Sequence, residues 1–115
     1  MKTIIDSKQA EQLKNVCEEH KVKLPGYWQK KPHGRDCMGL TELLDWLPKR
    51  IDVLEHSCYF ILEQWADKLT AVYCGYKSTS DESRFPSYPL TDEVIDSLFD
   101  LFIWTIENGF YKGVD

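Results

Sequence analysis

The chain has 115 residues, of which 43% are hydrophobic, so it can form one domain with its own core but is too short for two. No apolar run approaches membrane-spanning length, and the N-terminal residues MKTIID lack the pattern of a signal peptide. We therefore expect a single cytoplasmic domain over 1–115, with its four cysteines as free thiols rather than a disulfide framework.

The net charge of -5 is unevenly distributed along the chain. Residues 1–50 contain 10 Lys and Arg against 7 Asp and Glu, whereas residues 51–115 contain 4 against 12. The acidic second half repels phosphates, which argues against nucleic acid as the partner of the whole protein. A local basic site in the first half is still compatible with this distribution.

A surface helix is predicted over 8–20, because apolar residues recur there at helical spacing. Asp6 and Gln9 have the spacing of a capping box at its start. The following segment, 21–39, is rich in proline and glycine and predicts a long loop docked by its large apolar side chains.

A second, shorter helix is predicted over 41–48, where leucines recur at helical spacing and Pro48 ends or bends the helix. The apolar residues of the next segment, 51–76, fit both the spacing of a helix and that of strands. Its aromatic and β-branched residues favour a β-hairpin with strands over 57–63 and 69–76, in which Cys58, Phe60 and Leu62 share one face. The alternative is a long or broken helix, which would make the protein an all-α bundle.

The polar, serine-rich segment 77–89 predicts a surface loop that leads to a long C-terminal helix over 92–108. Thr91 is the predicted cap of this helix, and Asn108 with Gly109 ends it. Its apolar face is broad enough to lie against two layers at once. The predicted fold is therefore α+β, with a small antiparallel hairpin or sheet at about 57–76 packed against the C-terminal helix and two shorter helices alongside.

The segments LTELLDWLPK and LTDEVIDSLFDLFIWTIENGFYKG resemble parts of short proteins from bacterial mobile elements. The resemblance contains no motif of a known activity. It implies a small accessory or regulatory protein that works by binding.

Two surfaces are candidates for binding a partner. One is an acidic strip on the C-terminal helix with Trp104 near its edge, because tryptophan is enriched at interaction hot spots; the strip consists of Asp92, Asp96, Asp100 and Glu107. The other is the long loop, where aromatic and basic side chains are interleaved as in proteins that bind single-stranded nucleic acid; it contains Tyr27, Trp28, Lys30 and Lys31.

One set of residues has metal-ligand spacing. Cys17 and His20 are followed by His33 and Cys37, and two cysteines with two histidines suit tetrahedral zinc. This set predicts an alternative function, a zinc-stabilised nucleic-acid-binding module over 17–37. The competing interpretation is a buried Cys17 with two solvent-facing histidines.

A third hypothesis is a small thiol enzyme, because His56 and Cys58 would lie on one face of a strand as a potential base and nucleophile. The sequence contains no nucleophile elbow, phosphate loop or paired-histidine metalloprotease motif. We therefore favour a non-enzymatic interaction protein without a cofactor. Its expected partner is another protein or a second copy of the chain, and neither nucleic acid nor a membrane.

Overall fold

The computed structural model describes residues 4–24, 39–64, 72–81, 83–85, 93–111 and 113. Within these residues it has an α+β fold with three helices and one four-stranded antiparallel sheet. The helices are α1 (Ser7–His20), α3 (Leu40–Trp46) and α4 (Val94–Glu107), and the strands are β1 (Arg50–Val53), β2 (His56–Gln64), β3 (Val72–Ser78) and β4 (Arg84–Phe85). The strands follow one another in chain order across the sheet, which confirms the predicted α+β fold over the helical bundle.

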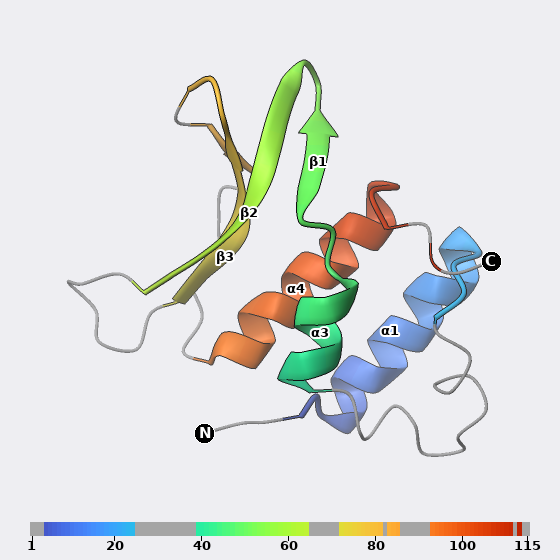
Figure 1. Ribbon diagram of the computed structural model, residues 1–115. Helices are drawn as coiled ribbons and strands as arrows, with labels where there is room; N and C mark the ends of the chain where they lie inside the picture. The colour runs from blue at the N-terminus through green and yellow to red at the C-terminus, as the bar shows by residue number, and fades with distance from the viewer. Residues whose placement is uncertain are drawn as a thin grey trace.

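Helix α4 is the central element, as its broad apolar face predicted. It contacts α1 and α3 as well as strand β3, so it lies between the other helices and the sheet (Figure 1). Its buried apolar residues form the largest part of the core: Ile95, Leu98, Phe99, Leu101, Phe102, Ile103 and Ile106. The helix begins at Val94 with Glu93 as its N-cap rather than Thr91, and Thr91 itself lies outside the described residues.

Helix α1 has the predicted boundaries and the predicted capping box. The Asp6 carboxylate accepts a hydrogen bond from the Gln9 backbone N–H at 2.8 Å, and the Gln9 side chain accepts one from the Asp6 N–H at 3.0 Å. The helix ends at His20 and is capped by Lys21, which takes the left-handed conformation with φ 56°. In Figure 1, α1 lies beside α4 and runs in the same direction.

Helix α3 is shorter than predicted, and it ends at Trp46 before Pro48. The Glu42 carboxylate accepts a hydrogen bond from the Gly39 N–H at 2.9 Å, which satisfies one free donor at the start of the helix. Leu43 and Leu47 are buried against the core, whereas Leu44 is 37% exposed.

The predicted hairpin is present as β2 and β3, but the sheet has two further strands. Strand β1 was missed because its turn to β2 consists of Leu54 and Glu55, with Leu54 at φ 56°, and neither residue is typical of a tight hairpin turn. Strand β4 was missed because it has only two residues, within a segment whose composition predicted a loop.

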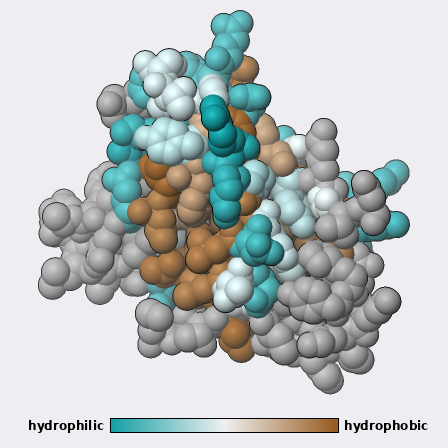
Figure 2. All heavy atoms as spheres, in the orientation of Figure 1, coloured by the Kyte–Doolittle hydropathy of each residue, from teal (hydrophilic) through white to brown (hydrophobic). Residues whose placement is uncertain are grey.

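One face of the sheet packs against the helices. Side chains alternate between the two faces of a strand, and the inner positions Ile51, Cys58, Cys74 and Tyr76 are all buried. Phe60 and Leu62 lie on this face too, as predicted, but Leu62 is 44% exposed. Figure 2 shows apolar side chains gathered between the sheet and the helices on the viewed side. Among the described residues, no helix is long and apolar enough to cross a membrane.

Candidate functional site

The other face of the sheet, which we call the outer face, is directed away from the helices. Its positions follow from the strand registers and from the burial of the inner set. Leaving aside Tyr73, whose side chain is not described, they are Arg50, Asp52, Ser57, Tyr59, Ile61, Glu63, Gly75, Lys77 and Arg84. Five of these nine residues are charged, so the outer face is a polar surface around a few apolar groups.

Four outer-face residues are paired in register across all four strands. Arg50 is paired with Tyr59, Tyr59 with Lys77, and Lys77 with Arg84. We call this set the cation–tyrosine row. Neighbouring strands lie about 4.8 Å apart, so the row spans about 14 Å from Arg50 to Arg84. Tyr59 is 40% exposed, and it has a cation on each side.

Hydrogen bonds to neighbouring side chains position the two ends of the row. Arg50 donates from Nη2 to Ser57 Oγ at 2.8 Å, and a guanidinium has further donors beyond the one used there. Arg84 Nη1 lies 2.7 Å from Glu63 Oε1, an ion pair that joins β4 to β2 across β3. By register, Gly75 of β3 lies between Arg84 and Glu63, and it is buried.

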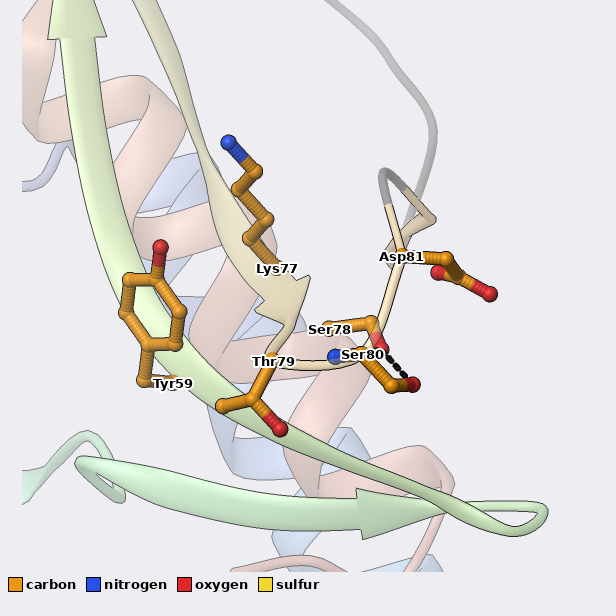
Figure 3. Close-up of a pocket in the computed structure, with 6 residues that line it drawn as sticks. All are labelled: Tyr59, Lys77, Ser78, Thr79, Ser80 and Asp81. Atoms are coloured by element: carbon orange, nitrogen blue, oxygen red, sulfur yellow. Dashed lines mark hydrogen bonds between the residues drawn. The ribbon is translucent and has the colours of Figure 1, made fainter.

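An open hollow of about 450 Å³ adjoins the row where β3 ends. It is lined by Tyr59, Lys77, Ser78, Thr79, Ser80 and Asp81. Figure 3 shows Tyr59 and Lys77 extending in the same direction from neighbouring strands, with the hydroxyl residues following in the turn after β3. The hollow therefore combines an aromatic ring, an ammonium group, several hydroxyls and a carboxylate.

His56 lies in a small polar cluster close to this hollow. Its Nδ1 is 3.3 Å from Ser78 Oγ and 3.7 Å from Asp81 Oδ2. The backbone and side chain of Ser83 lower the pKa of Asp81 through hydrogen bonds, and His56 contributes to the same shift. A catalytic relay would need serine and aspartate on opposite ring nitrogens, whereas here both contact the same one. The cluster is therefore suited to holding the turn in place.

The predicted pair of His56 and Cys58 shares the inner face, but the imidazole contacts Ser78 and Asp81 instead of the thiol. Cys58 is fully buried and donates from Sγ to the His56 carbonyl at 3.7 Å. Burial raises the pKa of the Cys58 thiol, and the carboxylates of Asp52 and Asp81 raise it further. A buried, protonated thiol is a poor nucleophile.

Only two of the four predicted zinc ligands, Cys17 and His20, lie among the described residues. Cys17 is buried, and burial raises the pKa of its thiol to about 11, with a further contribution from Glu18. His20 is exposed at the end of α1. His33 and Cys37 lie outside the described residues, and within the described ones no three His, Cys, Asp or Glu residues could hold a metal ion together. Zinc binding stays a prediction.

The loop residues proposed for binding, Tyr27, Trp28, Lys30 and Lys31, also lie outside the described residues. Trp104 is described, and it is partly buried against the core instead of projecting from it. Its ring stacks on Tyr76 with centroids 6.2 Å apart and packs against Phe110 at 5.2 Å. Trp104 therefore belongs to the contact between α4 and the sheet.

One residue of the predicted acidic strip makes a hydrogen bond within the molecule. Asp96 accepts a hydrogen bond from Gln9 Nε2 at 2.8 Å, which connects α4 to α1. Asp100 and Glu107 are exposed, and Asp92 lies outside the described residues.

The cation–tyrosine row was not predicted. The alternation of charged and apolar residues in Arg50–Val53 was the only hint of it, because the row depends on a register that no local pattern gives.

Comparisons with protein-family models, with curated proteins and with solved structures gave no match for this chain. Its function has to follow from the geometry of its own residues.

Proposed function

We propose that the protein works by binding another macromolecule through the outer face of its sheet, and that it does not catalyse a reaction. The cation–tyrosine row carries this proposal. Helix α4 packs against the inner face, while the row presents an exposed aromatic ring between cations on the opposite side. Tyrosine and arginine are the residue types enriched where proteins bind partners.

The chemistry of the buried groups supports binding over catalysis. The three described cysteines, Cys17, Cys58 and Cys74, are buried free thiols whose pKa values are raised. Nucleophilic thiols in enzymes have lowered pKa values in accessible, electropositive surroundings. The imidazole of His56 is engaged with Ser78 and Asp81.

Site-specific photo-crosslinking in cells tests the proposal. Tyr59 is replaced with benzoylphenylalanine, and a matched variant carries the same group at Lys14, which is exposed on α1. We expect a discrete adduct from the Tyr59 position, and none at that level from the Lys14 position. Digestion with nuclease or protease identifies the class of the captured partner. Equal adduct formation at the two positions, or none at Tyr59, would refute the proposal.

A further inference from the structure

We infer that the partner of the outer face is a single-stranded nucleic acid, with a base stacked on Tyr59 and phosphates bound by Arg50, Lys77 and Arg84. This inference rests on the proposed function and names its ligand. Non-specific binding of single strands requires two elements, cations that follow the backbone and aromatic faces on which bases stack. The cation–tyrosine row provides both in one line across the sheet.

The composition of the outer face favours nucleic acid over a protein partner. The core of a protein–protein interface is depleted in charged residues. Here five of the nine described outer positions are charged, three of them basic and two acidic, and the apolar groups among these nine are Tyr59 and Ile61. The hollow beside the row adds hydroxyls from Thr79 and Ser80, which suit contacts with sugar and phosphate, next to the carboxylate of Asp81.

A single strand fits better than a duplex. Stacking on Tyr59 requires an unpaired base whose face is accessible, whereas duplex bases are stacked on one another. The major groove admits a helix or a two-stranded ribbon, and a four-stranded sheet face is wider than either. The row therefore suits a flexible strand that lies flat on the sheet.

The net charge of -5 does not oppose this inference, because the charges are segregated. The three described helices contain eight acidic and two basic residues, whereas the four strands contain three basic and two acidic ones. Helix α4 packs against the inner face of the sheet, so the sheet separates the helical carboxylates from a strand bound on the outer face.

The test is a fluorescence anisotropy titration of the full chain with labelled oligothymidylate and oligouridylate of about twelve nucleotides, repeated over a range of salt concentrations. We expect saturable binding at about 50 mM salt. A plot of log affinity against log salt should have a slope of about -2, because each of three phosphates contributes about 0.7. The two oligonucleotides distinguish DNA from RNA, and a duplex of the same length should bind more weakly.

Three variants separate the two kinds of contact. Arg50→Gln should reduce the magnitude of the slope by about 0.7, because one phosphate contact is lost. Tyr59→Ala should weaken binding at least about fivefold without changing the slope, whereas Tyr59→Phe should bind as the parent does. Lys14→Ala removes a cation from the helical side and should change neither quantity. Circular dichroism checks that each variant is folded.

Absence of saturable binding, or equal effects of Arg50→Gln and Lys14→Ala, would overturn the inference. The outcome also separates it from the proposed function. If the oligonucleotides fail while the Tyr59 photoadduct contains a protein, the outer face binds a protein and only the nucleic-acid ligand is wrong. If that protein is a second copy of the chain, sedimentation will show self-association that Arg50→Gln weakens. Failure of both experiments refutes both proposals.

Discussion

Tyr76 connects three parts of the molecule through one fully buried side chain. From β3 its ring stacks on Trp104 of α4, and its edge meets Phe60 of β2 at 6.0 Å between centroids. Its hydroxyl donates a hydrogen bond to the Pro48 carbonyl at 2.7 Å. This bond fixes the segment that leads into β1, and with it the position of Arg50 in the cation–tyrosine row.

Tyr76→Phe should lower the free energy of unfolding by about 1 to 2 kcal/mol, because the partly buried Pro48 carbonyl loses its donor. Urea denaturation measures this change. Tyr59→Phe is the matched control, since it removes a hydroxyl from an exposed ring and should change stability by less than about 0.5 kcal/mol. Equal stabilities of the two variants would show that the Pro48 bond contributes little.

The buried thiols make stability depend on alkaline pH. Burial raises the pKa of Cys17 from 9.0 to about 11 and that of Cys74 to about 12. Unfolded thiols therefore lose protons at a pH where folded ones keep them. Their contribution to stability is complete below about pH 9 and is lost as the pH rises toward 11 and 12.

Cys17→Ala should accordingly flatten the decline of unfolding free energy above about pH 9, by at most about 1.4 kcal/mol per pH unit. The variant is expected to be less stable than the parent at neutral pH, because it leaves a small cavity. Urea titrations at several pH values between 8 and 10 measure the two curves. Parallel curves would mean that the Cys17 thiol ionises normally in the folded chain.

The Gln9 side chain links helices α1 and α4 at their N-terminal ends. Its Oε1 completes the capping box with Asp6, and its Nε2 donates to Asp96 of α4. The same amide therefore caps the start of α1 and attaches this helix to α4. A carboxylate at this position would keep the first contact and turn the second into a repulsion.

Gln9→Glu should lower the free energy of unfolding by about 1 to 2 kcal/mol, because two carboxylates then face each other. Adding Asp96→Asn should restore most of the loss, since the reversed pair again has one donor and one acceptor. A double-mutant cycle in urea measures the coupling between the two positions. Additive effects of the two substitutions would contradict the contact.

Local patterns predicted the elements whose determinants are close together in the chain. The Asp6 and Gln9 box, the α4 face and the β2–β3 hairpin all follow from spacing within a few residues. Strand β1 escaped because its turn uses Leu54 in a left-handed conformation that glycine or asparagine normally adopts. Strand β4 is too short for any period to be visible.

The candidate site could not be predicted because it depends on how distant segments pair. Arg50 and Arg84 come from the two edge strands, and only the full register places them in line with Tyr59 and Lys77. Trp104 was proposed as a contact residue from its type and its place near the edge of the acidic strip. In the structure, the Trp104 ring packs against the rings of Tyr76 and Phe110.

Among the residues that the structure describes, the helices and the sheet differ in charge, which the net charge of the chain does not show. The three helices carry more acidic than basic residues, whereas the outer face of the sheet presents three cations and two carboxylates. The net charge of -5 does not reveal this difference, and the expectation that the partner is not nucleic acid stays a prediction. The two faces of the sheet therefore differ: helix α4 and the core lie on the inner side, and the proposed binding surface lies on the outer side.

Mapping of backbone amide chemical shifts in ¹⁵N-labelled protein during addition of oligothymidylate tests whether the outer face is the binding surface. We expect progressive shifts at Arg50, Tyr59, Lys77 and Arg84 and in the turn after β3, with α1 and the exposed side of α4 unchanged. Shifts confined to the helices, or no shifts at concentrations that saturate ordinary single-strand binders, would contradict the assignment of the outer face.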